Sequence, residues 1–317
     1  MKKPIRAITV IDMRIFENSN LSIIGSRRKG YIFSGILILI SLISFAVNGL
    51  ELGVDFKGGR EFVIETSTVL DATAVRSALA SVLSSDPEVK TYVVEGVDQL
   101  LVRTVGEEDI DVVKGQLIRG IADAFPGSEP VIEKTYVVSA RFAKDLERGA
   151  IYSIIGSLLV IFVYVLIRFE WRFGVGAVTA LFHDVLITLG VFSIFQGHIG
   201  FSLQIDQTIV AAFLSIVGYS LNDTVVVFDR IREYTGLFKS ENYDTIINKS
   251  INNTLSRTII TSGTTLLVVV VLFIFGGEVL RGFAFALLIG ILIGTYSSIF
   301  VASPIVLELR NRATKGR

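Results

Sequence analysis

The sequence contains no cysteine, which excludes disulfides, thiol nucleophiles and cysteine-ligated metal sites. It has only two histidines, His183 and His198, too few for a multi-histidine metal centre. Neither a G-x-x-x-x-G-K-[ST] run nor a G-x-G-x-x-G run after a strand is present, so nucleotide hydrolysis by this chain is not expected. We therefore expect no enzyme activity, no metal and no cofactor, and any energy that the protein uses should come from an ion gradient.

Charged residues are also scarce. They make up 19% of the 317 residues, against 51% hydrophobic residues, and the mean hydropathy is +0.63. This composition is too apolar for a soluble domain of this length. The chain is predicted to be a multi-pass protein of the lipid bilayer, with no nucleic-acid partner.

Six apolar runs are long enough to cross a bilayer as helices, and the first starts later than in an ordinary secretory signal peptide. Basic residues gather in the N-terminal segment 1–30, the connector 229–257 and the tail 309–317, whereas the opposite short loops have almost none. The positive-inside rule therefore predicts that both termini are cytoplasmic. The predicted spans cover about residues 31–50, 150–168, 174–195, 207–228, 258–277 and 282–307.

The polar segment between the first two spans, residues 51–149, should then form a domain on the far side of the membrane. From Glu51 to Arg148 it has 18 acidic and 11 basic residues, a net charge of 11 − 18 = −7. Its periodicity predicts an element order of β-α-β-β-α-β. The predicted fold is thus a membrane all-α protein with an inserted α+β ferredoxin-like periplasmic domain. The strands fall at about 61–66, 91–95, 100–105 and 131–138, and the helices at about 71–84 and 107–125.

Within the connector, Ile246, Ile247, Ile251 and Leu255 recur at helical spacing and predict an amphipathic helix. Two positions for it stay open: its apolar face lies against the inner leaflet, or it is a solvated loop helix. In the last span, Gly290-x-x-x-Gly294 indicates close packing against another helix.

The fourth span contains the residue that is hardest to explain by structure alone. Asp223 lies between apolar stretches, next to Ser220 and Asn222, about 9 Å from the charged helix end that begins at Asp229. A carboxylate in hydrocarbon costs roughly 2.5 to 3.5 kcal/mol even by insertion measurements. We therefore interpret Asp223 as an ion or proton site; the alternative is a structural aspartate that only bonds a neighbouring helix.

Arg257 enters the fifth span from the same side of the membrane and is the predicted partner of Asp223. The third span adds His183 and Asp184 at a comparable depth, which makes a proton relay of four residues plausible. Each has a plainer interpretation: Arg257 as an interfacial anchor, His183 as a packed histidine, and Asp184 as a polar contact between helices that does not titrate.

Three stretches resemble the SecD/SecF family. The run Gly53-Val54-Asp55-Phe56-Lys57-Gly58-Gly59 resembles that family's G-x-D-F-x-G-G signature. The run from Val217 to Glu233, which includes Asn222, is similar to the fourth-span signature of its SecF branch, and Leu255–Ser262 is similar to the entry to the fifth span. The glycines of the first run favour a role in shaping the junction after the first span rather than in binding a ligand.

The resemblance implies a bacterial inner-membrane protein of the resistance-nodulation-division superfamily that pairs with SecD, either as a separate chain or as half of a fused protein. It implies assistance to late stages of preprotein export, driven by the proton motive force, with Asp223 and Arg257 on the proton pathway. His183 and Asp184 are not part of the matching motif. The expected partners are SecD, the SecYEG channel, accessory subunits such as YajC and YidC, and unfolded preprotein on the periplasmic side.

Two other classes of function stay open. The chain could be a non-conducting scaffold that stabilises SecD and the translocon, with Asp223 and Arg257 as a structural ion pair. It could also be a small-molecule proton antiporter of the same superfamily, which the small periplasmic domain disfavours. The side chains of Ser220, Asn222 and Thr224 carry oxygen atoms close to Asp223, so Na⁺ is chemically possible in place of H⁺.

Overall fold

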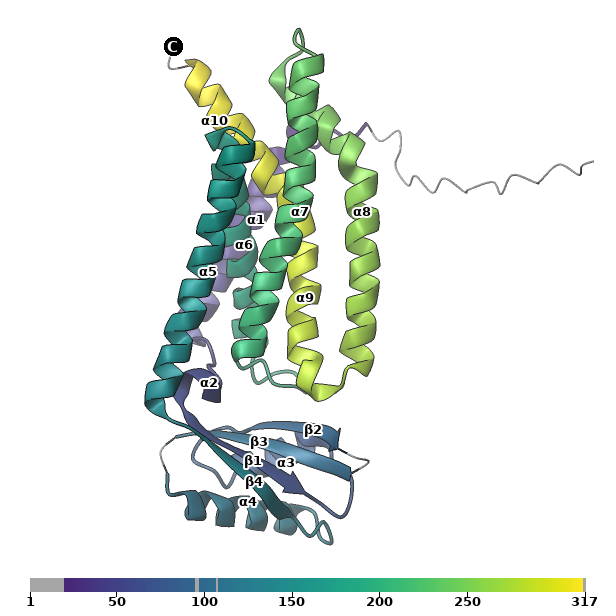
Figure 1. Ribbon diagram of the computed structural model, residues 1–317. Helices are drawn as coiled ribbons and strands as arrows, with labels where there is room; N and C mark the ends of the chain where they lie inside the picture. The colour runs from purple at the N-terminus through teal and green to yellow at the C-terminus, as the bar shows by residue number, and fades with distance from the viewer. Residues whose placement is uncertain (1–19, 95–96, 107, 316–317) are drawn as a thin grey trace, which may run out of the picture.

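The computed structural model describes residues 20–94, 97–106 and 108–315, and the predictions for the first 19 residues lie outside these ranges. A bundle of long helices stands on a small α+β domain (Figure 1). The first described residues and the C-terminal helix lie at the end of the bundle opposite this domain (Figure 1). This arrangement agrees with the prediction that the two ends of the bundle sequence lie on one side of the membrane.

Six helical segments in the described residues are long and apolar enough to cross a membrane, which makes the chain an integral membrane protein. The last segment consists of two helices, α9 and α10, joined by the π-helical turn η2 (Ser298–Ala302). A short 3-10 helix, η1 (Ile24–Ser26), precedes the first. The helices are α1 (Arg27–Val47), α5 (Ala140–Arg168), α6 (Trp171–Phe195), α7 (Gln207–Leu237), α8 (Tyr243–Phe275), α9 (Gly277–Ser297) and α10 (Ser303–Lys315).

Several helices extend beyond the predicted spans, because hydropathy marks the membrane-embedded part of a helix and not its ends. Helix α5 starts at Ala140, where Ser139 accepts a hydrogen bond from the Phe142 N–H and caps it. The expected connector 229–257 is mostly helical: α7 continues to Leu237 and α8 already begins at Tyr243.

The amphipathic face predicted in the connector belongs to the first half of α8. Ile246, Ile247 and Ile251 are buried. Ile247 and Ile251 pack in one cluster with Ile24, Phe228, Ile231 and residues of α6 and α10. Neither predicted position was right: the apolar face packs against the bundle instead of facing lipid or solvent. The Asn252 side chain also forms hydrogen bonds with both backbone groups of Leu21. It accepts from the Leu21 N–H at 2.9 Å and donates to the Leu21 carbonyl at 2.9 Å.

The α+β domain contains one antiparallel sheet of four strands in the order β2-β3-β1-β4. Two helices pack on one face of the sheet through Val75, Leu79, Leu117 and Ile121, which meet Phe62, Ile64 and Val102 in a core of their own. The element order β-α-β-β-α-β matches the predicted order. The elements are β1 (Gly59–Glu65), α3 (Ala72–Ala80), β2 (Glu88–Val94), β3 (Val97–Val105), α4 (Ile110–Ala124) and β4 (Val131–Val138).

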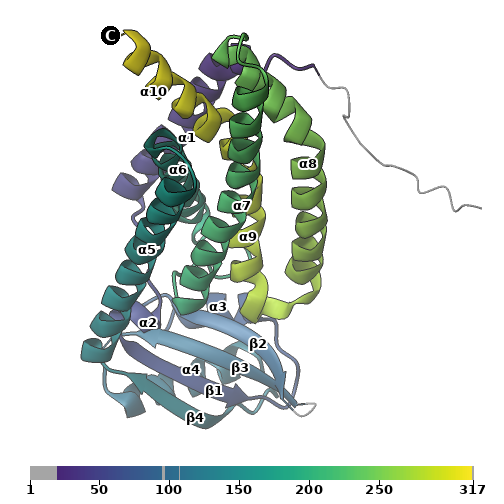
Figure 2. The same ribbon diagram turned by 45° about the horizontal axis from the view of Figure 1, so that its top comes forward.

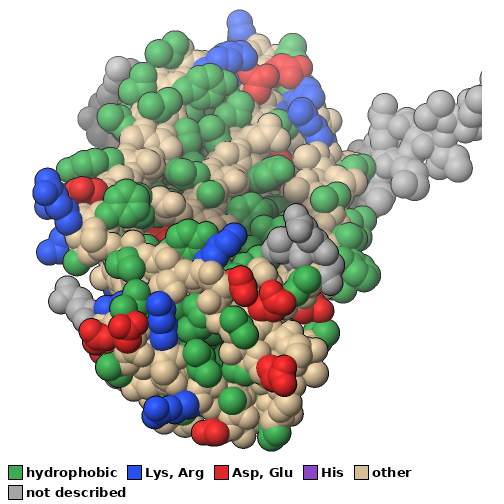
Figure 3. All heavy atoms as spheres, turned by 60° about the horizontal axis from the view of Figure 1, so that its bottom comes forward, with side chains coloured by type: hydrophobic (Ala, Val, Ile, Leu, Met, Phe, Trp, Pro, Cys, Tyr) green, Lys and Arg blue, Asp and Glu red, His purple; other side chains and the backbone are tan. Residues whose placement is uncertain are grey.

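The other face of the sheet is turned toward the membrane bundle, and α4 lies on the far side of the sheet from the bundle (Figures 1 and 2). From the domain end, acidic side chains appear in several groups among hydrophobic and backbone atoms (Figure 3). Strand β2 lies closest to the ends of α7 and α9 (Figure 1). The sheet therefore sits directly below the helices that hold the buried carboxylate Asp223.

The signature run 53–59 makes the sharp turn from α1 into the domain. Val54–Lys57 form a helical turn, α2, which the sequence did not predict, and Gly58 and Gly59 follow with φ of 78° and 153°. A Cβ on Gly59 would overlap the carbonyl oxygen of Thr104 on β3. These two positions therefore need glycine for backbone reasons, as the junction role requires.

Replacing Gly59 by alanine should destabilise the α+β domain by roughly 2 to 4 kcal/mol, since the new methyl group strains the backbone and displaces β3. The measurement is the temperature at which the domain of the purified chain becomes sensitive to protease. Gly115→Ala is the matched control, because a Cβ there meets open space on α4. The control should be neutral or slightly stabilising, by up to about 1 kcal/mol. The same protease-sensitivity temperature in Gly59→Ala and Gly115→Ala would contradict the need for glycine at position 59.

Candidate functional site

Asp223 lies on the side of α7 that faces α8 and α9, and its exposed fraction is 8%. Small residues allow this approach. A Cβ on Gly290 of α9 would overlap Ile216 of α7, and one on Gly294 would lie 3.0 Å from the Ser220 side chain. The predicted close packing at Gly290-x-x-x-Gly294 is thus a contact with α7, and it brings α9 backbone next to the turn that carries Asp223.

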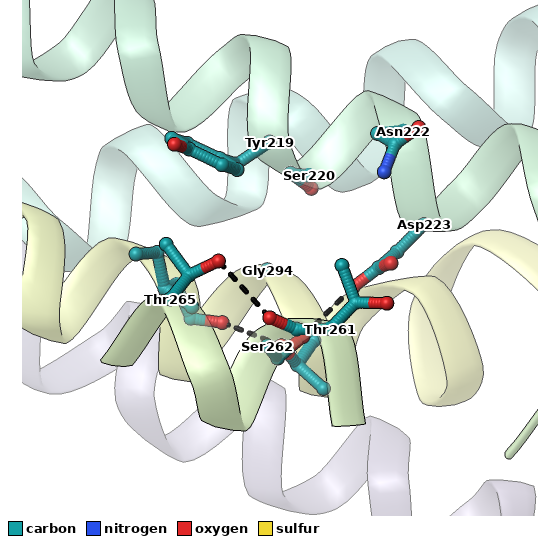
Figure 4. Close-up of a pocket in the computed structure, with 10 residues that line it drawn as sticks. Tyr219, Ser220, Asn222, Asp223, Thr261, Ser262, Thr265 and Gly294 are labelled. Atoms are coloured by element: carbon teal, nitrogen blue, oxygen red, sulfur yellow. Dashed lines mark hydrogen bonds between the residues drawn. The ribbon is translucent and has the colours of Figure 1, made fainter. Parts of the chain in front are cut away.

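Hydroxyl groups surround the Asp223 carboxylate. Ser262 of α8 donates a hydrogen bond of 3.0 Å to Asp223 Oδ2, and Thr295 Oγ1 of α9 lies 2.7 Å from Ser262 Oγ (Figure 4). Three helices therefore meet through one chain of side-chain hydrogen bonds. A hydroxyl can donate to a carboxylate or accept from a carboxylic acid, so this chain suits either protonation state of Asp223.

A small cavity of about 20 Å³ borders Asp223, which is enough for about one water molecule. Figure 4 shows polar side chains from α7 and α8 on both sides of it. A water there would have several hydrogen-bonding partners, as a stable buried water requires. The polar side chains that line the cavity are Tyr219, Ser220, Asn222, Asp223, Thr261, Ser262, Thr265 and Thr295.

Arg257, the predicted partner of Asp223, is one to two turns from Ser262 on α8 and is exposed. Its positive charge acts on Asp223, but no ion pair joins the two side chains in the described part of the chain. The carboxylate bonds Ser262 instead. The structure therefore has Arg257 as a nearby cation and not as a direct partner.

Asp184 is the centre of a second polar network and is fully buried. Its Oδ1 is 2.9 Å from His183 Nδ1, and its Oδ2 accepts hydrogen bonds from Ser220 at 2.6 Å and Ser297 at 2.8 Å. Ser220 comes from α7 and Ser297 from α9, so Asp184 joins α6 to two of the helices that line the Asp223 cavity. Ser220 is one turn from Asp223, which puts Asp184 and Asp223 at neighbouring levels of the bundle, as the sequence predicted.

The network continues from His183 to α1. His183 Nε2 is 3.0 Å from Ser34 Oγ, Ser34 Oγ is 3.1 Å from the Tyr296 hydroxyl, and that hydroxyl donates to the Gly30 carbonyl at 2.8 Å. Because the Tyr296 hydroxyl donates its hydrogen to the Gly30 carbonyl, the Ser34 hydroxyl must donate to the Tyr296 oxygen. His183 Nε2 must then donate to Ser34. This is the arrangement in which every contact contains one hydrogen.

The donor order leaves one proton between His183 Nδ1 and Asp184 Oδ1. Either the imidazole is protonated and the carboxylate charged, or both groups are neutral with the proton on Asp184. Both side chains are buried, so this pair shares one proton between two neighbouring atoms away from solvent.

The sequence indicated the acids and His183, but it missed the residues that connect them. Ser34 is a single serine in an apolar span and gives no positional signal. Thr295, Tyr296 and Ser297 stand in a run of four consecutive hydroxyl residues, 295–298, inside an apolar span, and this run was the signal that could have found them. Among the described residues, no three His, Asp or Glu side chains come together as a metal site.

Comparison with known proteins gives two family matches. The model of the C-terminal part of the protein export membrane proteins SecD/SecF matches residues 122–312, and the model of the SecD/SecF GG motif matches residues 43–68. The second match contains the whole 53–59 run, and the first contains Asp184, Asp223 and Arg257.

Curated relatives match nearly the full length of the chain. The protein translocase subunit SecF of Rhodothermus marinus is 64% identical over 305 residues, which are 96% of this chain and 98% of that protein. The SecF of Vibrio alginolyticus is 42% identical over 285 residues, covering 89% of this chain and 87% of its own.

A crystal structure of SecDF from Thermus thermophilus, described as a translocon-associated membrane protein, has the same fold. Its TM-score is 0.76 at 32% identity, over 93% of this chain. The chain spans 39% of that SecDF, so it corresponds to one part of the longer protein.

The donor order around His183 predicts that its Nε2 carries a proton in the folded protein. Nitrogen-15 NMR of histidine-labelled protein measures this directly, and His198→Gln removes the one other histidine signal. We expect the chemical shift of a protonated Nε2, and Ser34→Ala should alter it because the acceptor is lost. A neutral His183 with its proton on Nδ1 alone would contradict the deduced network.

Proposed function

The chain belongs to the SecD/SecF family of protein export membrane proteins, and on that basis we propose that it works as the SecF partner of SecD, using the proton motive force to assist late stages of preprotein translocation. The observation that carries the coupling to protons is the buried Asp223, held by a hydroxyl and bordered by a cavity of water size. The factor is not an enzyme and uses no cofactor; the transported ion supplies the energy.

The proton step needs only the groups around Asp223. A proton delivered through the cavity adds to a carboxylate oxygen and forms an O–H bond. The new acid can then donate to Ser262, whose own hydroxyl turns toward Thr295. Loss of the proton reverses both hydrogen bonds. Because Ser262 and Thr295 belong to α8 and α9, the reversal changes how these helices pack against α7.

Arg257 assists from a distance. The positive charge of its guanidinium favours the charged form of the Asp223 carboxylate by Coulomb attraction. A movement of α8 that changes this distance would alter the tendency of Asp223 to hold its proton. The absence of a tight ion pair supports this role, since a tight pair would keep Asp223 charged.

Asp184 and His183 form the second proton-holding site. Ser220 donates to Asp184 and also lines the cavity beside Asp223, so a water in the cavity would connect the two networks. A proton could pass from one acid to the other through this water and the Ser220 hydroxyl. Na⁺ in place of H⁺ is compatible with the same oxygen atoms.

The proposed orientation places both ends of the bundle in the cytoplasm and the α+β domain in the periplasm, in a bacterial inner membrane. Arginine and lysine side chains at the end opposite the domain support it. The strand order β2-β3-β1-β4 with two helices on one face supports a ferredoxin-like assignment. Further partners are SecYEG, accessory subunits such as YajC and YidC, and unfolded preprotein at the domain.

Asp223→Asn should abolish the export that depends on the proton motive force, because an amide holds the hydrogen bond but cannot gain and lose a proton. The measurement is preprotein transport and proton conduction in membrane vesicles that contain the chain with SecD, with complex abundance checked in the same samples. Asp229→Asn is the control on the same helix, since Asp229 is half exposed in a surface ion pair with Arg168.

Loss of conduction with an intact complex supports the proton pathway. Full transport in Asp223→Asn would overturn it. Poor assembly with SecD in place of lost turnover would favour the non-conducting scaffold, and efflux of small molecules from cells that express the pair would favour an antiporter.

A further inference from the structure

The α+β domain is joined to the bundle covalently at two points. Residues 48–58 connect it to α1, and Ser139 connects β4 to α5. Neither α1 nor α5 lines the Asp223 cavity, which is formed by α7, α8 and α9. A change in packing at Asp223 therefore reaches the domain directly through non-covalent contacts at the ends of α7 and α9.

The end of α7 is joined by backbone hydrogen bonds to the signature run. Gly53 N–H donates to Ile205 O at 2.9 Å, and Ile205 N–H donates to Glu51 O at 2.8 Å. Two carboxylates then cap the helix: Asp206 accepts from Ile209 N–H at 2.9 Å, and Asp55 accepts from Gln207 N–H at 3.1 Å. The family signature residue Asp55 thus binds the first turn of the helix that carries Asp223.

A buried charge cluster joins the same helix end to the sheet. The Oδ2 atom of Asp206 lies 3.7 Å from Lys90 Nζ on β2 and 3.6 Å from the Arg103 guanidinium on β3. Glu88 pairs with both cations at 2.7 and 3.5 Å, and Glu61 pairs with Arg103 at 2.6 Å. Asp206 and Glu88 are both almost completely buried. Such a cluster favours one specific arrangement of the helix end and the sheet, because separating the acids from the cations would leave buried unpaired charges.

The domain also contacts the neighbouring helix end and loop. The backbone N–H of Thr91 on β2 interacts with the Glu278 carboxylate in the first turn of α9. Thr73 at the start of α3 donates to the Gly200 carbonyl at 2.8 Å, in the loop between α6 and α7. Every one of these contacts is polar and directional, so a shift of α7 or α9 is transmitted to the sheet and not absorbed by sliding.

We propose that the cluster of Glu61, Glu88, Lys90, Arg103 and Asp206 is the coupling element that transmits movement of α7 to the α+β domain. This inference rests on the proposed function, since it assigns the path by which a proton event at Asp223 does work outside the membrane. Lys90, Arg103 and Asp206 are positioning residues, since none of them lines the Asp223 cavity.

The charges of the cluster permit a sharp test. Three acids share two cations, a net charge of 2 − 3 = −1. Lys90→Gln makes it −2 and leaves two buried carboxylates with one cation. Adding Asp206→Asn returns the cluster to −1 and keeps the helix cap, because an asparagine oxygen also accepts from Ile209 N–H. Burial raises the pKa of Asp206, and the nearby Lys90 opposes this shift.

The experiment uses the full chain with SecD and compares Lys90→Gln, Asp206→Asn, the double variant and the control Lys134→Gln, an exposed lysine on the edge strand β4. Docking of the domain is measured by disulfide formation between Thr73→Cys and Gly200→Cys. A Cβ on Gly200 would lie 3.8 Å from Thr73 Oγ1, and the chain has no other cysteine. Export and proton conduction are measured in the same membranes.

Lys90→Gln should lower the disulfide yield and the export rate about tenfold, with the SecD complex and Asp223-dependent conduction retained. The double variant should recover most of the disulfide yield and most of the export rate. The control Lys134→Gln should behave as the unaltered chain. Unchanged docking and export in Lys90→Gln, or losses that the double variant does not relieve, would overturn the proposal. The disulfide yield does not depend on proton conduction, so it still tests the coupling element if the proposed function of Asp223 fails.

Discussion

A carboxylate buried among apolar helices is the constraint on which this structure depends. Asp184 and Asp223 both lie inside the bundle, where an unpaired charge is expensive, so each needs hydrogen-bond donors from other helices. Serines of α7 and α9 donate to Asp184, and a serine of α8 donates to Asp223. Donors as short as serine and threonine reach an acid only when the helix backbones are close. The glycines of α9 allow that approach, so the packing of the bundle and the chemistry of the acids have the same origin.

The choice of hydroxyl partners has a chemical consequence. A guanidinium bonded directly to Asp223 would stabilise only the charged carboxylate and would fix its protonation state. A hydroxyl stabilises both forms, since it donates to the carboxylate and accepts from the acid. With Ser262 next to Asp223 and Arg257 kept at a distance, the site fits the proposed exchange of a proton better than it fits a permanent ion pair.

The sequence was sufficient to find the acids because their cost in a membrane makes them conspicuous against apolar neighbours. The contrast between apolar runs and polar segments also predicted the six spans. The distribution of basic residues predicted that both ends of the bundle lie on one side of the membrane. The sequence could not connect Ser34 or Tyr296 with His183, because these residues are joined only by the folded structure, over separations that no periodicity records. It also did not predict the charge partners of Asp206. An aspartate directly before an apolar span indicates a helix cap, but the cations that Asp206 meets, Lys90 and Arg103, lie on strands far away in the sequence.

The sequence also could not predict which residues pack against an apolar helix face. The stripe of isoleucines in the first half of α8 shows an apolar face, but the pattern is the same whether that face meets lipid, solvent or protein. Its actual neighbours, Ile24 and Ile231, come from η1 and α7. Hydrophobic periodicity reports that a surface is covered, and only tertiary structure reports what covers it.

Helix α7 links these features because it is long and continuous. Its 31 residues extend over about 46 Å at ~1.5 Å per residue, with Asp223 near the middle. One end is held in a large apolar cluster by Phe228 and Ile231. The other end is held in a second apolar cluster by Ile209 and Phe213, and also by hydrogen bonds and charges at Asp206. Close packing transmits strain along such a helix. In the proposed coupling, a change of packing at Asp223 therefore reaches the α+β domain through the contacts of Asp206, which join this end of α7 to the sheet.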